Sequence, residues 1–277
     1  MNDILPRVFS CAKDIAIGAG SILIEQKKTH TIQKVKNALG TDFATSADYA
    51  SEKYIVEQIQ KHFPSHSIFA EEGQHKYEKK GADFEWIIDP LDCTRDYARG
   101  SSTYYVLMGI EYKGNPVCGV VYSPEINKMY ASYEGSPLIC DDKKEHVSSV
   151  TSLEKSVIIT RLPISSCTDE ELDSYSRLQK ALIKSTFRTR AYSCDMTSII
   201  DVALGRSDGF VLPTHLEHFK GPKWWDIAPA FALIKSAGGI ITDFDGSPIK
   251  NRDLTNGLIA SNPHLHPLLV DLVQKNR

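Results

Sequence analysis

The chain has 277 residues, of which 42% are hydrophobic and 24% charged, and its formal net charge is -3. This composition is that of an ordinary globular protein with one or two domains, and it excludes a strongly basic protein that binds nucleic-acid polymers. No apolar run approaches the ~18 residues that a membrane span requires, and residues 1–7 lack the layout of a secretory signal. We therefore expect a cytoplasmic protein with no membrane partner.

The six cysteines are widely spaced and form no CxxC pair. This spacing favours reduced thiols and gives no support to a structural zinc site. The segment His215-Leu216-Glu217-His218 does not have the HExxH spacing of a zinc protease.

In the first half of the chain, apolar residues at helical spacing predict helices over residues 5–27 and 47–62, the second with Ser46 as its N-cap. Short apolar runs predict strands at residues 67–70 and 86–88, followed by an antiparallel meander over residues 105–139.

In the second half, helices and strands alternate. Strands are predicted at residues 157–159, 210–212, 240–242 and 258–260, and helices at 169–183, 196–204, 227–237 and from about 263. Helices on both sides of a β meander indicate a layered α/β or α+β sandwich. We expect two parts, residues 1–147 and 148–277, that form one compact catalytic unit.

Carboxylates stand at the ends of predicted strands or at the start of a helix. These acids are Asp48, Glu71, Glu72, Asp89, Asp92 and Asp226. A cluster of carboxylates is hard to stabilise without cations, whereas divalent ions make it favourable. Because no histidine or cysteine stands at ligand spacing, the oxygen donors point to Mg²⁺ rather than Zn²⁺. Taken singly, each acid also fits a solvated loop residue or a helix cap.

The spacing Asp89-Pro90-Leu91-Asp92 allows both acids and the Leu91 carbonyl to face one point, because proline fixes the local turn. Cys93 and Thr94 would then open a short helix whose backbone N–H groups suit a phosphate. Metal-binding acids beside an anion-binding turn favour metal-assisted phosphoryl hydrolysis.

Five segments resemble the inositol monophosphatase family. Residues 86–97, WIIDPLDCTRDY, resemble its first signature, WIIDPIDGT followed by an aromatic residue, and residues 223–239 resemble its WD-x-A-x-A segment ending in GG. Residues 42–48, 68–72 and 257–263 resemble the family's DxVTxAD element, GEE element and closing strand and helix. The resemblance covers nearly the whole chain in the right order.

The resemblance implies an α+β fold with α-β-α-β-α layers and an Mg²⁺-dependent, Li⁺-sensitive phosphomonoesterase, often a homodimer, with two or three Mg²⁺ per site. By motif, Glu71, Asp89 and the Leu91 carbonyl would hold one Mg²⁺. Asp89, Asp92 and Asp226 would hold a second, with Asp89 as the bridge.

The resemblance also implies roles around the metals. Asp48, Thr94 and Glu71 would form the catalytic set, in which Thr94, oriented by Asp48, helps to deprotonate the attacking water. The backbone amides of Cys93 and Thr94 would receive the phosphate, with Lys36 nearby. Ser193, Cys194, Asp195 and Glu217 would contact the rest of the substrate.

Two departures from the family pattern stand out. Cys93 replaces a glycine, which we expect to be tolerated if its φ stays negative. Residues 95–97 resemble the branch of the family that removes nucleotide 3′-phosphates. The substrate is therefore either inositol monophosphate or a related sugar or polyol phosphate, or alternatively adenosine 3′,5′-bisphosphate. A member of another class, a non-catalytic regulatory or scaffold protein, would be expected to lack a metal acid, and every motif acid is present.

Overall fold

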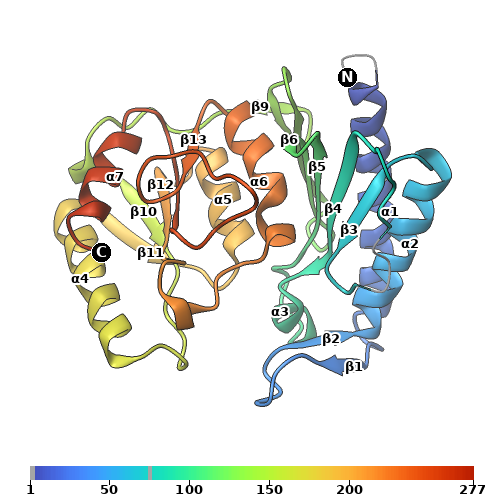
Figure 1. Cartoon of the computed structure of the whole chain (residues 1–277), viewed down its shortest axis with the longest axis horizontal. Coiled ribbons are helices and arrows are strands. Elements are labelled where there is room, and N and C mark those ends of the chain that lie inside the picture. The colour runs from blue at the N-terminus through green and yellow to red at the C-terminus, as the bar shows by residue number, and fades with distance from the viewer. Residues whose placement is uncertain (1–3, 74–76) are drawn as a thin grey trace. The chain divides into compact units, whose positions relative to one another are not determined.

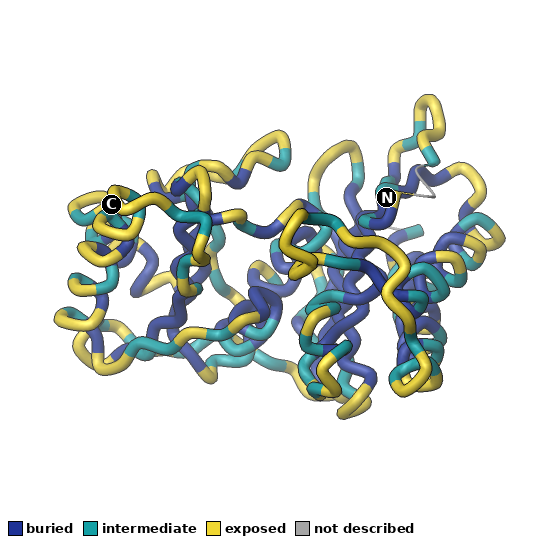
Figure 2. Tube along the Cα trace, turned by 90° about the horizontal axis from the view of Figure 1, so that it is seen from below, coloured by how far each residue is buried: buried dark blue, intermediate teal, exposed yellow. Residues whose placement is uncertain are grey.

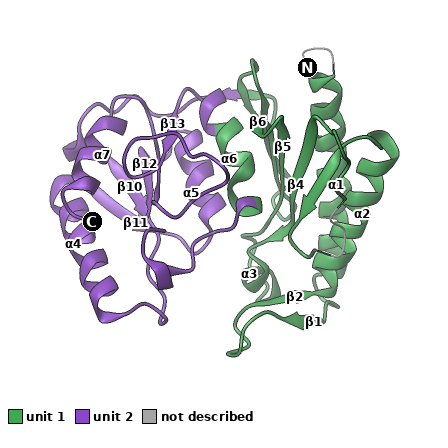
Figure 3. Ribbon diagram, in the orientation of Figure 1, with its two compact units in different colours: residues 1–143, 225–233 green, residues 144–224, 234–277 purple. Residues whose placement is uncertain are grey.

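The computed structural model describes residues 4–73 and 77–277. The chain divides into two compact units, one of residues 1–143 and 225–233 and the other of residues 144–224 and 234–277 (Figure 3). Within the described part of the chain, no helix is both long and apolar enough to span a membrane. Figure 2 shows that buried residues, in dark blue, gather in the interior of each unit and that exposed residues, in yellow, lie mostly on its outer turns.

The first unit is built on a seven-stranded sheet with the order β3-β4-β5-β6-β7-β8-β9. Its strands are β3 (Ser67–Ala70), β4 (Phe84–Asp92), β5 (Tyr105–Tyr112), β6 (Asn115–Ser123), β7 (Lys128–Tyr133), β8 (Leu138–Cys140) and β9 (Lys143–Glu145). Strand β3 pairs parallel to β4, and the pairs from β4 to β8 are antiparallel. The predicted meander is confirmed.

Helices α1 (Leu5–Gln26) and α2 (Ser46–His62) cover one face of this sheet (Figure 1). Both helices are confirmed, but the N-cap of α2 is Thr45 rather than Ser46. Thr45 is extended, and its hydroxyl accepts a hydrogen bond from the Ala47 amide at 3.2 Å, whereas Ser46 is already the first helical residue. Capping requires the extended conformation that Thr45 adopts.

The opposite face of the sheet carries residues 225–233 of α6 (Trp224–Ser236). Gly109 and Gly119 face each other across β5 and β6. A Cβ atom on Gly109 would lie 2.6 Å from the Cβ of Ala228, and one on Gly119 would overlap the carbonyl of Pro229. Glycine is therefore required at both positions for the helix to approach the sheet this closely.

A small hairpin and a short helix complete the first unit. Strands β1 (Ile32–Val35) and β2 (Phe43–Thr45) form an antiparallel two-stranded sheet, and α3 (Thr94–Ala98) follows β4. The hairpin was not predicted, because every residue of β1 is exposed and the strand has no alternation of buried and exposed positions.

The second unit contains a five-stranded mixed sheet with the order β11-β10-β12-β14-β13. Its strands are β10 (Val157–Thr160), β11 (Arg188–Ala191), β12 (Gly209–Leu212), β13 (Ile240–Thr242) and β14 (Leu258–Ser261). Its helices are α4 (Asp169–Ser185), α5 (Asp195–Ala203), α7 (His266–Gln274) and the short η1 (Leu153–Lys155) and η2 (Glu217–Phe219). Leu178, Leu182, Leu269 and Val273 of α4 and α7 pack in one core with Ile158 of the sheet. The predicted strands and helices of this half are present, while the polar edge strand β11 was missed.

The expectation of reduced thiols holds for part of the set. Cys11, Cys118, Cys140 and Cys167 are free. Cys93 and Cys194 are not free thiols, so the expectation is wrong for these two. Wide spacing along a sequence does not report the environment of each sulfur in the fold.

Candidate metal centre

Asp89 and Asp92 lie within strand β4 instead of following it. The sequence predicted a strand ending at Ile88, but β4 continues to Asp92. Asp89 pairs with Leu107 and Asp92 with Tyr105, so β4 contains one extra residue at Pro90-Leu91. In a regular strand, residues three apart face opposite sides of the sheet, and a one-residue bulge brings them to the same side. The bulge therefore explains how both acids reach one site.

Asp226 completes a group of three carboxylates. One oxygen from each of Asp89, Asp92 and Asp226 lies within 4.8 Å of the other two. Asp226 is in the first turn of α6. This helix can pack closely on the sheet because Gly109 and Gly119 have no side chains. The sequence predicted this convergence from segments more than a hundred residues apart.

Asp89 is the most buried member of the group, with 2% of its surface exposed. Burial raises the pKa of its carboxyl well above the ordinary value, and the charges of Glu71, Asp92 and Asp226 raise it further. The Leu91 amide donates a hydrogen bond of 3.0 Å to Oδ1 of Asp89. This single donor does not offset three acidic neighbours, and the donor set suits a hard divalent cation such as Mg²⁺.

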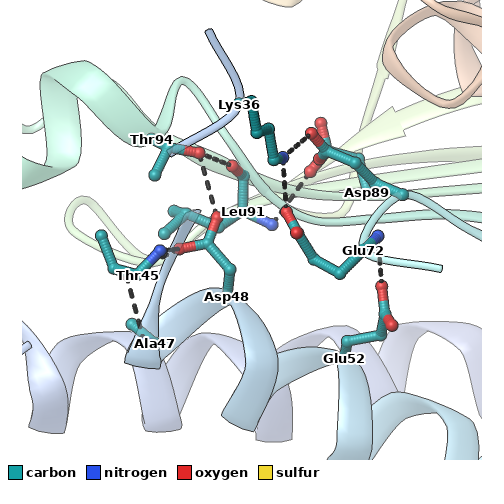
Figure 4. Close-up of polar contacts among 10 residues, drawn as sticks. Lys36, Thr45, Ala47, Asp48, Glu52, Glu72, Asp89, Leu91 and Thr94 are labelled. Carbon is teal, nitrogen blue, oxygen red and sulfur yellow. Dashed lines mark hydrogen bonds and ion pairs between the residues drawn. The ribbon is translucent and has the colours of Figure 1, made fainter. Parts of the chain in front are cut away.

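Lys36 supplies positive charge at the edge of the acid group. Its Nζ lies 2.8 Å from Oε1 of Glu71. The same atom lies 2.7 Å from Oε1 of Glu72, as Figure 4 shows. Burial acts to lower the pKa of Lys36, but the two glutamates outweigh it and raise that pKa above its usual range. The sequence placed Lys36 beside the site without identifying Glu72 as its partner.

Thr94 and Asp48 form the second polar arrangement of the site. The Thr94 hydroxyl lies 3.0 Å from Oδ1 of Asp48 and 3.0 Å from the Leu91 carbonyl. The other carboxylate oxygen of Asp48 accepts hydrogen bonds from the amide and hydroxyl of Thr45, at 2.8 and 2.6 Å. Asp48 thus caps α2 and orients Thr94 at the same time, as Figure 4 shows. Burial raises its pKa to about 6, although the Thr45 hydrogen bonds act in the opposite direction.

Helix α2 supports the site through two further residues that the sequence analysis missed. Ser51 donates a hydrogen bond of 2.9 Å to the Pro90 carbonyl and so holds the bulge of β4. Glu52 accepts the Glu72 amide at 2.9 Å. Glu52 stands four residues after Asp48, and residues at this spacing share one face of a helix, so the spacing was an available signal.

Cys93 adopts a backbone conformation different from the expected one. Its φ is +66° and its ψ is +43°, in the left-handed region, where a negative φ was expected. This region favours glycine and costs another residue on the order of 1–2 kcal/mol. The glycine usual in the family at this position thus matches the conformation that the turn into α3 requires.

The residues expected to contact the remainder of the substrate all belong to the second unit. Cys194 is the buried N-cap of α5, and Asp195 begins that helix. Oδ2 of Asp195 lies 2.7 Å from Arg161, whereas its buried Oδ1 has no hydrogen-bond partner among the described residues. Glu217 is exposed at the start of η2, and Ser193 lies in the loop before α5. Their contact with a substrate stays a prediction.

The histidines of the 215–218 segment give no support to zinc. Both ring nitrogens of His215 are buried without a hydrogen-bond partner in the described part of the chain, and His218 pairs with Glu171 at 3.2 Å. Among the residues that the structure describes, neither histidine belongs to a group with metal-binding geometry.

The chain is similar to known proteins over nearly its whole length. A family model described as the inositol monophosphatase family matches residues 5–277. A relative from Neisseria meningitidis serogroup B, called putative Nus factor SuhB, is 30% identical over 99% of this chain and 98% of its own length.

Solved structures show the same fold. The inositol monophosphatase from Anabaena (Nostoc) sp. PCC 7120 is 26% identical, with a TM-score of 0.79 over 99% of this chain and 97% of that chain. The extragenic suppressor protein suhB from Bartonella henselae has a TM-score of 0.84 over 98% of this chain and 100% of that chain, at 24% identity. The chain therefore has the mixed α+β fold of these proteins and belongs to the inositol monophosphatase family.

Proposed function

We propose that this protein is a Mg²⁺-dependent phosphomonoesterase that hydrolyses inositol monophosphate or a related sugar or polyol phosphate. The observation that carries the proposal is the convergence of Asp89, Asp92 and Asp226 within 4.8 Å. Three carboxylates this close repel one another, and a divalent cation turns that repulsion into binding. Family membership supports the same activity.

Five groups would hold Mg²⁺: the carboxylates of Glu71, Asp89, Asp92 and Asp226 and the carbonyl of Leu91. All are oxygen donors, and burial, together with the charges of Glu71, Asp92 and Asp226, raises the pKa of Asp89. When bound, Mg²⁺ supplies Lewis acidity that makes water more acidic and neutralises charge on phosphoryl oxygens.

The proton of the attacking water would pass through Thr94. Because the Thr94 hydroxyl can donate its hydrogen to Oδ1 of Asp48, its own lone pair is available to accept a proton from water. Asp48 must be ionised to take up the proton that Thr94 passes on, and its pKa of about 6 keeps it mostly ionised at neutral pH. Positioned acid–base groups of this kind contribute about 10²–10⁴-fold to rate.

Two sets of residues are the proposed contacts for the substrate. The amides of Cys93 and Thr94, with Lys36, are the proposed phosphate-binding groups. Ser193, Cys194, Asp195 and Glu217 are the proposed contacts for the remainder of the substrate.

Phosphate release with and without Mg²⁺ tests the proposal. We expect turnover of inositol 1-phosphate that requires Mg²⁺ and falls on adding Li⁺, and we expect Asp92→Asn to abolish it. Asp83→Asn is a matched control, because Asp83 lies in the same unit with its side chain 54% exposed. Absence of Mg²⁺-dependent phosphate release from any small phosphomonoester would refute the proposal.

Two alternatives are outcomes of the same assay. Faster release from adenosine 3′,5′-bisphosphate than from inositol 1-phosphate would assign the protein to the nucleotide 3′-phosphatase branch, which the sequence Arg95-Asp96-Tyr97 resembles. Some relatives are called Nus factor SuhB, and Mg²⁺ binding without turnover would favour a regulatory role here. Light scattering of the purified protein tests the homodimer that the family resemblance implies.

A further inference from the structure

A buried glutamate beneath the site has no part in the chemistry proposed above. Glu52 lies in α2 with no exposed surface. One of its carboxylate oxygens, Oε1, has no hydrogen-bond partner among the described residues. Burying a carboxylate with one oxygen unpaired is unfavourable, so Glu52 adds no evident stability by its charge.

The other oxygen of Glu52 has a defined contact. Oε2 accepts the backbone N–H of Glu72 at 2.9 Å (Figure 4). The N–H of the preceding residue, Glu71, donates to the Ile88 carbonyl of β4 at 3.1 Å. The two consecutive amides are therefore fixed from different sides, one by the sheet and one by α2.

This double attachment fixes the backbone from which the Glu71 side chain extends. Glu71 follows the last residue of β3, where the ladder with β4 ends. Beyond that point the Glu52 carboxylate supplies the acceptor that the next residue of a strand would have supplied. Glu71 and Glu72 can then both reach the Nζ of Lys36, at 2.8 and 2.7 Å.

We propose that Glu52 is a positioning residue for the metal centre: its hydrogen bond to the Glu72 amide fixes the Glu71-Glu72 turn and thereby directs the Glu71 carboxylate toward Mg²⁺. The proposal rests on the proposed function, because it takes Glu71 as a metal ligand. Partners that orient metal ligands in this way typically affect metal affinity ~10- to 100-fold.

The test compares Mg²⁺ dissociation constants, measured by isothermal titration calorimetry, for the wild-type chain and three variants. Glu52→Met keeps the volume and removes the acceptor, and we expect it to weaken Mg²⁺ binding by ~10-fold or more. Glu52→Gln keeps an acceptor oxygen and loses the charge, and we expect affinity within about threefold of wild type, because the acceptor is what positions the turn. Glu57→Ala is the matched control, because Glu57 is on the same helix with its side chain 59% exposed.

The outcomes separate this proposal from the proposed function. Wild-type protein that binds no Mg²⁺ would overturn both. Wild-type binding with unchanged affinity in Glu52→Met, even with a lowered melting temperature in EDTA, would leave the proposed function intact and overturn the positioning role. Equal losses in Glu52→Gln and Glu52→Met would also overturn it, since charge rather than the hydrogen bond would then be responsible. If Glu52→Met does not fold, the Gln variant alone decides, because affinity reduced tenfold there refutes the proposal.

Discussion

Replacing Asp89 by asparagine should stabilise the metal-free protein and should remove the additional stability that Mg²⁺ gives the wild type. In the metal-free protein the Asp89 carboxyl is buried among Glu71, Asp92 and Asp226, and its pKa is raised well above the ordinary value. In the Asp89→Asn variant, the side-chain amide oxygen keeps the hydrogen bond from the Leu91 amide. The NH₂ group of the new side chain donates where the carboxylate repelled.

The size of the effect follows from the spacing of the acids. Two unit charges within 4.8 Å repel by about 3.5 kcal/mol or more at an effective dielectric constant of about 20. Protonation limits this cost, because neutralising an aspartate of ordinary pKa near 3.9 at pH 7 requires about 4 kcal/mol. We therefore expect Asp89→Asn to stabilise the metal-free protein by about 2–4 kcal/mol, or roughly 4–16 °C in melting temperature.

The dependence on pH gives the sign of the effect a separate check. An acid whose pKa is higher in the folded state binds more protons when folded, so folding becomes less favourable as pH rises from the ordinary pKa through the raised one. The metal-free wild type should lose stability over that range, and Asp89→Asn should lose less. With Mg²⁺ at 100 times its dissociation constant, the wild type gains about 2.7 kcal/mol that the variant lacks.

Differential scanning calorimetry in EDTA and in Mg²⁺, at pH 6 and pH 8, measures the stability of both proteins without metal, its change with pH and its increase on Mg²⁺ binding. Asp83→Asn, at an exposed position, controls for general loss of a negative charge. If the Asp89→Asn variant melts below the wild type in EDTA, repulsion among the acids does not destabilise the metal-free protein. An equal Mg²⁺-induced shift in the melting temperature of both proteins would show that Asp89 is not a metal ligand.

Three further changes test other parts of the site. Thr94→Ala should lower kcat by ~10²–10⁴-fold and leave the Mg²⁺-induced shift in melting temperature intact. The kcat of the wild type should fall as pH drops through about 6, where Asp48 becomes protonated. A kcat that does not change from pH 5 to 8 would contradict the role of Asp48 in proton transfer. Gly119→Ala should destabilise the protein by about 1–3 kcal/mol or more, because the new methyl group would overlap the Pro229 carbonyl. The same change should weaken Mg²⁺ binding in calorimetry. Unchanged Mg²⁺ affinity would show that the position of Asp226 in α6 does not depend on this contact. Lys36→Met should destabilise the metal-free protein by about 3 kcal/mol, because it removes the positive charge that pairs with Glu71 and Glu72. It should also enlarge the stabilisation by Mg²⁺. Equal free energies of unfolding for the variant and the wild type, measured with denaturant in EDTA, would contradict this expectation.

The regular elements and the acids could be predicted because their signals are local. Helix α1 repeats buried residues every three or four positions, and β5 to β7 are apolar runs separated by turns. Asp89, Asp92 and Asp226 could be assigned to one site from their motifs, and the structure brings them together.

The remaining features depend on contacts that only the tertiary structure creates. The exposed strand β1 and the polar edge strand β11 have no apolar pattern, and pairing alone defines them. Strand β4 continues through Pro90 because it forms a bulge against β5. A proline in a sequence argues against a regular strand at that position, so the continuation was not predicted. Glu52 was missed because a buried acid inside a helix gives no sequence signal apart from its distance from Asp48.

The packing of β4 explains how repelling acids stay together before any cation binds. Trp86, Ile87 and Ile88 immediately precede Asp89 and are fully buried. Each large apolar side chain contributes about 1.5–3 kcal/mol when buried, so the three together exceed the roughly 4 kcal/mol that the repulsion at Asp89 can cost at pH 7. The strand therefore holds the acid in place, and the unfavourable charge density that remains is available to increase the affinity for Mg²⁺.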